Sequence, residues 1–409
     1  MTTQLVPKPL DRARDEFRSR FGGDPRVFRA PGRVNLIGGH LDYNEGWVLP
    51  IAIDRSCYVL AQRRNDHILR IHSRHFNETL EFFPDDARPS SLHWSSYARG
   101  VAWSLAREVP ALPGADLLIE SEVPLGSGLS SSAALEVAVG LALLGLAETT
   151  MDPTALALAC QRAENEYIGM RCGIMDQLVA CLGRRGCALL IDCRTLAVEP
   201  LPIDETRVRV IVANTMVKHA LASSEYNVRR HECEDAAARV RKCRPTVRTL
   251  RDIPWPEIET ESNSWPGAIR CRARHVTTEI ARVHAAVRVL RSSDFESLGR
   301  LMSQSHDSLD ADYQVTSAEL NMMVTIARGL PGMLGARMTG GGFGGCTVNL
   351  VRAEHAESFA SELARRYEAE TRLRPDVYIC RASGGACELD FSKRSEQSAG
   401  GAPAERSLP

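Results

Sequence analysis

The sequence lacks the features that would place the protein in a membrane or on a nucleic acid. No stretch approaches the roughly 20 apolar residues that a membrane-spanning helix needs, and the first twenty residues hold no apolar segment of the signal-peptide kind. Charge of one sign is not in excess either, because 50 Lys and Arg face 51 Asp and Glu without a long single-sign block. We therefore expect a cytoplasmic protein that acts on small molecules, with no nucleic acid and no membrane among its partners.

Pairs of the form Cys-x-x-Cys are also absent, although the chain has 12 cysteines. The cysteines are scattered through 409 residues, and several lie in apolar segments such as LALAC and MDQLVACLG. This distribution is typical of reduced, mostly buried thiols. It argues against a disulfide scaffold and against a structural zinc site.

What is present is a mixed α/β pattern in a chain long enough for two domains. Apolar, β-branched runs predict strands at residues 57–64, 68–73 and 115–123, and a helical segment at 94–109 lies between the last two of these. A further helix is expected at 153–169, with Asp152 as its N-cap and proline at its first position. Thr316 and Glu319 have the spacing of a capping box before a helix at 318–330.

The domain organisation follows from these patterns. We expect an N-terminal domain at residues 1–203 and a C-terminal domain at residues 204–388. Residues 389–409 are rich in Ser, Gly, Ala and Pro, which predicts a disordered tail.

The most informative motif is PLGSGLSSSAALEVAVGLAL at residues 124–143. A predicted strand runs into a Gly-Ser-Gly turn with three serines and then into an apolar helix. Backbone N–H groups and hydroxyls at a helix N-terminus favour an anion, so this order predicts a phosphate-binding loop. It is not a Walker A loop, because the turn contains no lysine. A serine-capped helix after a tight turn would explain one serine and one glycine but not the whole motif.

A second glycine cluster, MTGGGFGGCTVNLV, lies at residues 338–351. It contains a formal G-x-G-x-x-G, but the residues that follow alternate like a strand, whereas a dinucleotide-binding fingerprint needs a helix there. Five glycines around Phe343 indicate close approach of the backbone to a ligand or to another backbone segment. A plain hairpin turn also fits this cluster taken alone.

Two further segments carry polar groups suited to chemistry. AENEYIGMRCGIMDQL places Glu164 late in one predicted helix and Asp176 in the first turn of the next. These carboxylates could serve metal binding and general-base chemistry respectively, although each alone is equally typical of an ordinary helix residue. RVNLIGGHLDYN, at residues 33–44, gathers Arg33, His40 and Asp42 around a glycine pair.

Together, in this order and spacing, these motifs resemble the GHMP kinases, and RVNLIGGHLDYN is similar to the corresponding motif of the galactokinase family. The resemblance covers most of residues 26–387. It implies an α+β, two-domain GHMP-kinase fold, with an N-terminal ribosomal-protein-like α/β domain and a ferredoxin-like C-terminal domain. It also implies a galactokinase activity, in which the γ-phosphoryl group of MgATP is transferred to the anomeric hydroxyl of α-D-galactose, by an enzyme that we expect to be a monomer.

The resemblance assigns roles to the residues that match the family's motifs. Asp176 would be the catalytic carboxylate, and Arg33 would keep it ionised and offset charge on the transferred phosphoryl group. Ser132 and Glu164 would be the Mg²⁺ ligands, since both offer hard oxygen atoms. The phosphate loop would comprise Gly126, Ser127, Gly128, Leu129, Ser130, Ser131 and Ser132.

The same resemblance implies a sugar site and an adenine site. The sugar would be bound by hydrogen bonds from His40, Asp42, Gly173 and Tyr226. Trp94 and Tyr97 would form the wall of the adenine site with Ser73 as a neighbour, although paired aromatics at this spacing are equally typical of a buried core.

One position departs from the family pattern. The usual motif is G-E-H-T-D-Y-N, and this chain has Gly39 in place of the glutamate that would bond the sugar's C6 hydroxyl. We expect phosphorylation of galactose with weaker selection at C6. Two alternatives are a kinase for a sugar altered at C6, such as galacturonate or L-arabinose, and an inert sensor of galactose and ATP. Sensors have a shortened serine/alanine stretch after the glycine turn, whereas SSSAAL is full length here.

Overall fold

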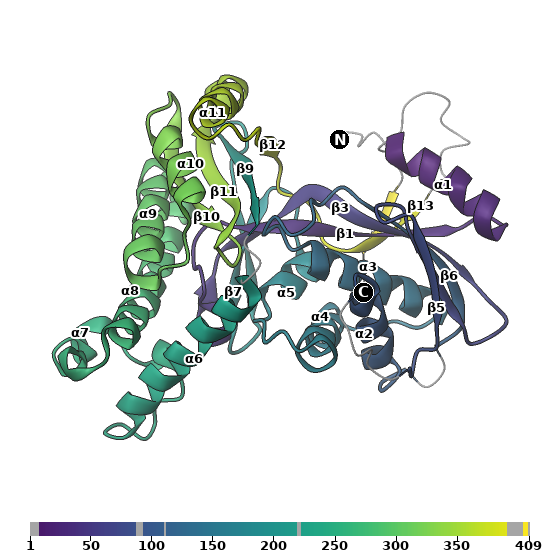
Figure 1. Ribbon diagram of the computed structural model, residues 1–409, viewed down its shortest axis with the longest axis horizontal. Helices are drawn as coiled ribbons and strands as arrows, with labels where there is room; N and C mark the ends of the chain where they lie inside the picture. Colours follow the sequence, from purple (N-terminus) through teal and green to yellow (C-terminus); the bar gives the residue numbers. More distant parts are fainter. Residues whose placement is uncertain (1–7, 87–92, 110–111, 219–221, 391–403, 408–409) are drawn as a thin grey trace.

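The computed structural model describes residues 8–86, 93–109, 112–218, 222–390 and 404–407. Two parts lie side by side in Figure 1, with the earlier residues in purple and blue on one side and the green helices of the later residues on the other. Within the described ranges, no helix is long and apolar enough to cross a membrane.

A seven-stranded sheet is the framework of the N-terminal part. The strands predicted at residues 57–64, 68–73 and 115–123 are confirmed, since these ranges overlap β3 (Pro50–Arg63), β4 (Leu69–Ser73) and β6 (Ala115–Ser121). All neighbouring strands pair antiparallel except β4 and β6, which are parallel. In spatial order the strands are β14 (Ala404–Ser407), β13 (Cys387–Asp390), β1 (Arg26–Asn35), β3 (Pro50–Arg63), β6 (Ala115–Ser121), β4 (Leu69–Ser73) and β5 (Glu78–Phe82).

Helices cover both faces of this sheet. α1 (Lys8–Phe21) packs Leu10, Ala13 and Phe17 on one face, and four helices cover the other face (Figure 1). At the centre of these four is α3, most of whose residues are apolar and buried, as is typical of a helix enclosed by its neighbours. The four helices are α2 (Ser95–Leu105), α3 (Ser131–Leu146), α4 (Pro153–Arg162) and α5 (Met175–Leu182).

A small three-stranded sheet adjoins the N-terminal part, and a four-stranded sheet forms the C-terminal part. The small sheet has the order β2 (Trp47–Val48), β7 (Cys187–Asp192) and β8 (Val198–Pro202). The four-stranded antiparallel sheet has the order β10 (Met333–Thr339), β11 (Gly344–Arg352), β9 (Val208–Lys218) and β12 (Asp376–Cys380).

The chain order of the C-terminal part confirms the ferredoxin-like prediction. Strand β9 is followed by helices, then by the β10–β11 hairpin, a helix and β12, which is a βαββαβ arrangement. The helices are α6 (Ala222–Arg241), the short α7 (Trp255–Ile258), α8 (Gly267–Arg291), α9 (Phe295–Ser308), α10 (Ala318–Arg328) and α11 (Ala356–Thr371).

We propose that the domain boundary lies between β8 and β9, since β8 belongs to the small sheet and β9 to the C-terminal sheet. The chain then crosses back, because β13 pairs with β1 of the N-terminal sheet. Part of the tail that we expected to be disordered is also in this sheet: residues 389–390 end β13, and β14 pairs with it. Residues 391–403 and 408–409 lie outside the described residues.

Candidate active site

A cavity of about 290 Å³ opens between the two glycine-rich loops and the end of β1. Most of the residues that the sequence singled out for phosphate and sugar contacts line it. The lining also includes residues that the sequence did not single out, namely Asn35, Met170, Cys172, Met175 and Arg337. From the predicted sets the lining residues are Arg33, Gly39, His40, Asp42, Gly126, Gly128, Ser130, Ser131, Ser132, Glu164, Gly173, Asp176 and Tyr226.

Arg33 and Asp176 form a bidentate ion pair in this cavity. The Arg33 Nε and Nη2 donate to the two Asp176 oxygens at 2.8 and 2.7 Å, and its Nη1 donates to the Gly128 carbonyl at 2.6 Å. The Ser130 hydroxyl donates to the same carboxylate. Three separate segments thus fix one carboxylate: β1 supplies the arginine, α5 the aspartate, and the loop before α3 the serine. Charge-assisted, bidentate pairs of this kind are stronger than neutral hydrogen bonds and fix the orientation of a carboxylate.

The predicted phosphate loop ends at the N-terminus of α3. Ser130 precedes α3 with a left-handed backbone (φ 59°), and Ser131 and Ser132 form its first turn. Free N–H groups at the start of a helix favour anionic phosphate oxygens. Two residues of the loop do not line the cavity: Ser127 is buried and donates its hydroxyl to the Pro124 carbonyl at 2.8 Å, and Leu129 is buried in the core.

The second glycine cluster packs against the first, backbone to backbone. A Cβ at Gly340 would lie 2.7 Å from the Gly128 carbonyl oxygen, and one at Gly345 would lie 2.6 Å from that of Ser127. Both glycines also have left-handed backbones, at φ 83° and 84°. The β10–β11 turn thus packs directly on the backbone of the phosphate loop. This is the close approach to another backbone segment that the glycines predicted.

The predicted sugar-binding residues form a connected part of the cavity wall, where the ring centres of His40 and Tyr226 lie 5.6 Å apart. His40 Nδ1 is 2.8 Å from the Tyr43 hydroxyl, which in turn is 2.7 Å from the Tyr313 hydroxyl. His40 Nε2 is buried and has no hydrogen-bond partner among the described residues. Burial holds the pKa of His40 well below its usual value, so the imidazole is neutral near pH 7.

Asp42 and Gly173 are in direct contact in the same wall. A Cβ at position 173 would lie 2.0 Å from an Asp42 oxygen, so a larger residue would displace the carboxylate. Burial raises the pKa of Asp42 to about 6, and the Asp176 carboxylate adds to the shift. Tyr226, on α6, completes the wall and packs edge-on against Tyr43 with ring centres 5.2 Å apart.

Glu164 is a buried carboxylate at the edge of the cavity, within an irregular π-helical turn (Ala163–Ile168) that follows α4. Such turns are frequent at functional sites. Burial raises its pKa to about 7. It accepts hydrogen bonds from Gln177 at 2.7 Å, from Cys172 and from Ser132, but no described Lys or Arg pairs with it.

These features fit a Mg²⁺ ion. Glu164 and Ser132 both line the cavity and offer hard oxygen atoms, and the Glu164 carboxylate has no neutralising cation in the described protein. Groups of three or more His, Cys, Asp or Glu suited to a metal are absent from the described residues. A metal held by two protein ligands would thus rely on phosphate and water oxygens, as Mg²⁺ commonly does.

The three residues expected at the adenine site lie outside the cavity lining. Trp94 stacks on Phe76 with an interplanar angle of 12° and donates to Glu78 at 2.7 Å. The Ser73 hydroxyl accepts from the Phe76 backbone N–H at 3.4 Å. Burial raises the pKa of Tyr97, and the nearby Glu164 adds to the shift. An adenine role for these residues stays a prediction, and Phe76, half exposed beside Trp94, is a neighbour that the sequence did not single out.

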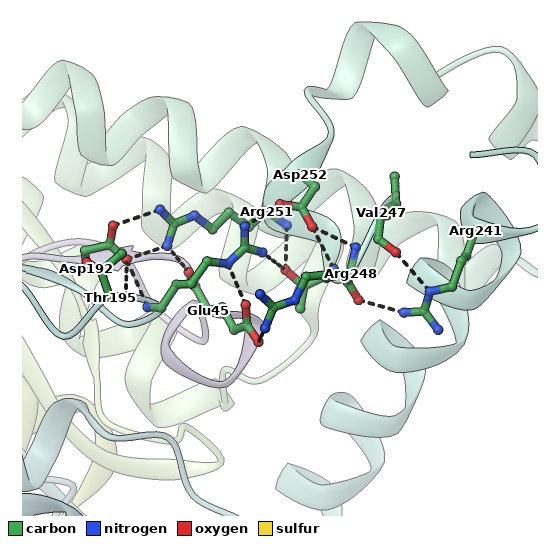
Figure 2. A network of polar contacts seen from close by, with 10 residues as sticks. Glu45, Asp192, Thr195, Arg241, Val247, Arg248, Arg251 and Asp252 are labelled. Carbon is green, nitrogen blue, oxygen red and sulfur yellow. Dashed lines mark hydrogen bonds and ion pairs between the residues drawn. The ribbon is translucent and has the colours of Figure 1, made fainter. Parts of the chain in front are cut away.

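A polar network fixes the chain directly after the segment 33–44, which carries His40 and Asp42 (Figure 2). Arg251 donates to both oxygens of Asp192 and, at 2.6 Å, to the Glu45 carbonyl, and it lies 3.6 Å from the centre of the Trp47 ring. The Glu45 carboxylate also accepts hydrogen bonds from Arg194 at 2.6 Å and from Arg248 at 3.3 Å. The network joins Glu45, which directly follows residues 33–44, to the segment between α6 and α7.

Replacing Arg251 with alanine is expected to lower the free energy of unfolding by about 2 to 3 kcal/mol, because Asp192 would lose a largely buried ionic partner. Urea denaturation measures the change. The matched control is Arg248→Ala, since that side chain is 68% exposed and makes one ion pair in the same network; its effect should stay below about 0.5 kcal/mol. Equal losses in both variants would contradict the central role of Arg251.

Comparison with known proteins agrees with this geometry. A galactokinase galactose-binding signature matches residues 15–63, and the N-terminal and C-terminal GHMP kinase models match residues 96–184 and 286–369. Galactokinases from Chloroflexus aggregans and Bos taurus are 46% and 40% identical, over 90% and 93% of this chain and 95% and 97% of theirs.

Among solved structures, Lactococcus lactis galactokinase in complex with galactose aligns with a TM-score of 0.89 at 33% identity, over 93% of this chain and 100% of that one. A mevalonate kinase from Methanococcus jannaschii shares the fold, with a TM-score of 0.65 at 17% identity. The chain is thus a sugar kinase with the two-domain GHMP fold, and it belongs to the galactokinase family.

Proposed function

We propose that the protein transfers the γ-phosphoryl group of ATP to the anomeric hydroxyl of α-D-galactose and releases galactose 1-phosphate and ADP. The observation that supports this best is the Arg33–Asp176 pair, which faces the phosphate loop within one cavity. A carboxylate beside a phosphate site is what transfer to a hydroxyl requires, because the proton and the phosphoryl group must be handled together.

In this mechanism Asp176 accepts the proton of the anomeric hydroxyl. A bond forms between the anomeric oxygen and the γ-phosphorus, and the bond from the γ-phosphorus to the bridging oxygen breaks, so that ADP leaves. Arg33 orients Asp176 by two hydrogen bonds and offsets charge on the transferred group. N–H groups at the start of α3 and the hydroxyls of Ser131 and Ser132 bind the phosphates.

We further propose that His40, Asp42, Gly173 and Tyr226 hold the sugar by hydrogen bonds. The unpartnered His40 Nε2 supports this role, since a buried polar atom of this kind needs a partner and the cavity offers none from the described protein. Trp94, Tyr97 and Ser73 are proposed to form the adenine site, and the protein is proposed to act as a cytoplasmic monomer.

Mg²⁺ is proposed to bind Ser132 and Glu164. When bound, it would neutralise charge on the ATP phosphates. Replacing Glu164 with glutamine should raise the Mg²⁺ concentration needed for half-maximal ATP binding by at least about tenfold, because loss even of outer partners of a metal costs 10- to 100-fold in affinity. Titration calorimetry of ATP at a series of Mg²⁺ concentrations measures this directly.

The matched control for Glu164 is Glu136→Gln. Glu136 is equally buried and shares the Gln177 amide, at 3.2 Å, but it does not line the cavity. Its replacement should leave the Mg²⁺ dependence of ATP binding unchanged. The metal assignment is wrong if the Glu164 variant has the Mg²⁺ dependence of the wild type.

The activity itself is tested by an ADP-release assay with galactose, N-acetylgalactosamine, arabinose and galacturonate, followed by identification of the phosphorylated product. We expect turnover with galactose and formation of the 1-phosphate. Absence of ATP turnover with every sugar would overturn the kinase proposal. Turnover of galactose at a position other than the anomeric hydroxyl would overturn the assignment of Asp176.

A further inference from the structure

Arg337 is a buried guanidinium without a hydrogen-bonding partner at two of its nitrogens. It lies on β10, is 1% exposed and lines the cavity beside Gly39 and His40. Its Nε and Nη1 are buried and donate a hydrogen bond to no atom of the described residues. Buried arginines are almost always paired, because an unpaired buried charge is costly. An arginine that is left unpaired at a binding cavity therefore points to a partner in the ligand.

The nearest carboxylate does not satisfy Arg337. Glu279 lies 4.0 Å from Nη1, beyond hydrogen-bond distance. One Glu279 oxygen already accepts from the Gly38 and Gly39 N–H groups and from Ser305, and the other accepts from Arg282 Nε at 2.6 Å. Two guanidinium groups thus share one carboxylate, and a positive charge is left over.

The histidines nearby do not change this balance. Burial lowers the pKa of His275 to about 4 and holds that of His40 far below its usual value, so both are neutral near pH 7. Burial also lowers the pKa of Arg337 to about 10, which leaves it charged at pH 7. The wall of the cavity at this point is therefore cationic.

Because residue 39 is glycine, no side chain lies between its backbone and this guanidinium. A Cβ at position 39 would lie 2.5 Å from Arg337 Nη2 and 3.3 Å from Leu309. The absence of a side chain lets Nη2 occupy the place beside the backbone at this wall. A ligand can then reach the guanidinium from the cavity.

The position of Arg337 on β10 sets how far it lies from the phosphate loop, where phosphoryl transfer would take place. Gly340 packs on Gly128, whose carbonyl accepts from Arg33 at 2.6 Å. Arg337 is three residues earlier in the chain, which is about 10 Å along an extended backbone. A sugar with its anomeric hydroxyl at Asp176 would therefore direct the far side of its ring toward Arg337.

The chemistry of a sugar identifies the group that would meet the guanidinium. A carboxylate accepts two parallel hydrogen bonds from an arginine and neutralises it. In a hexopyranose only C6 can be oxidised to a carboxylate while the ring and its hydroxyls are kept. The C6 hydroxyl of galactose can also accept a hydrogen bond, so galactose remains a substrate.

We propose that Arg337 binds a carboxylate at C6 of the sugar, so that the enzyme phosphorylates galacturonate as well as galactose. This inference rests on the sugar 1-kinase function proposed above and extends its substrate class to hexuronates. The reaction is the same for both sugars: the anomeric oxygen bonds to the γ-phosphorus, the bond to the bridging oxygen breaks, the hydroxyl proton passes to Asp176, and ADP leaves.

The test measures kcat/KM for galacturonate and for galactose in the wild type and in the variant Arg337→Gln. We expect galacturonate turnover by the wild type. We expect the ratio of kcat/KM for galacturonate to that for galactose to fall by about 100-fold in the variant, because a hydrogen-bonded charge is lost for one substrate only. Arg291→Gln is the control, since it removes an arginine that pairs with Glu199 and does not line the cavity; its ratio should match the wild type.

The outcomes separate the two proposals. Turnover of galactose without turnover of galacturonate would overturn this inference and leave the galactose kinase in place. An unchanged ratio in Arg337→Gln would also overturn it, even if galacturonate is a substrate. A variant too unstable to assay is replaced by Arg337→Lys, which keeps the charge but not the bidentate fork, and for which we expect a smaller fall in the same ratio. Turnover of neither sugar would overturn both proposals.

Discussion

Replacing Asp176 with asparagine is expected to lower kcat for galactose by about 1,000-fold, within the 10²- to 10⁴-fold range of general acid–base catalysis. An asparagine amide does not accept a proton near neutral pH. It can also accept only one of the two hydrogen bonds that Arg33 donates to the carboxylate at 2.8 and 2.7 Å. ADP release gives kcat, and titration calorimetry with galactose gives the affinity, which should change by less than about tenfold.

Ser130→Ala is the matched comparison for this variant. It removes the third hydrogen bond to Asp176 but keeps the carboxylate and its pairing with Arg33. One hydrogen bond to a charged group is worth about 1.5 to 3 kcal/mol, so kcat should fall by roughly 10- to 100-fold. An Asp176→Asn variant with a tenth or more of the wild-type kcat would remove Asp176 from the proton-accepting role.

Local signals predicted much of the fold. The Asp152 side chain accepts from the Thr154 and Ala155 N–H groups with proline at the first helical position, as the sequence indicated. The capping box at Thr316 and Glu319 was wrong: Ser317 caps α10. The Thr316 hydroxyl instead bonds Asp310, which lies in the turn before it. Residue spacing alone cannot show which of two neighbouring hydroxyls caps a helix when one of them bonds to another part of the fold instead.

The candidate site was predictable where its chemistry lies in short motifs, and not where it depends on pairing between distant strands. Arg33, Asp176 and the serines of the phosphate loop each sit in a recognisable segment, and they meet in the cavity. Arg337 directly precedes the second glycine cluster, but nothing local shows that its side chain is buried without a partner. That fact depends on β10 crossing the end of β1, where the Thr339 hydroxyl accepts from the Asn35 N–H at 3.0 Å.

The packing of β10 against the end of β1 also explains the effect expected of glycine at position 39. From sequence, Gly39 is a lost acceptor for the sugar, which predicts weaker selection at C6 but not which group at C6 is preferred. The buried Arg337 guanidinium beside it indicates which C6 group is preferred. With glycine at position 39, the cavity has an unpaired positive charge there rather than an apolar gap. Restoring a carboxylate at this position should therefore exchange one substrate preference for another.

Gly39→Glu is expected to lower the ratio of kcat/KM for galacturonate to that for galactose by about 100-fold. The new carboxylate would pair with Arg337, whose flexible end can move from the 2.5 Å contact that a Cβ would make. A bound hexuronate would then lose its charged partner, which is worth a factor of about 10 to 150, and would meet a like charge as well. Galactose should gain relative to arabinose, which lacks C6, because a glutamate can accept a hydrogen bond from the C6 hydroxyl.

Gly39→Ala separates charge from space in this experiment. Alanine adds the same Cβ beside Arg337 without a carboxylate, so it should change both ratios by less than about tenfold, the lower limit of the discrimination that one methylene provides. If the alanine variant lowers the galacturonate ratio as strongly as the glutamate variant, steric contact rather than charge determines the preference. If Gly39→Glu leaves the relative rates for galactose and arabinose unchanged, position 39 does not read C6. Pairing of the introduced carboxylate with Arg337 would also neutralise a buried charge, so the glutamate variant alone should unfold at higher urea concentration than the wild type.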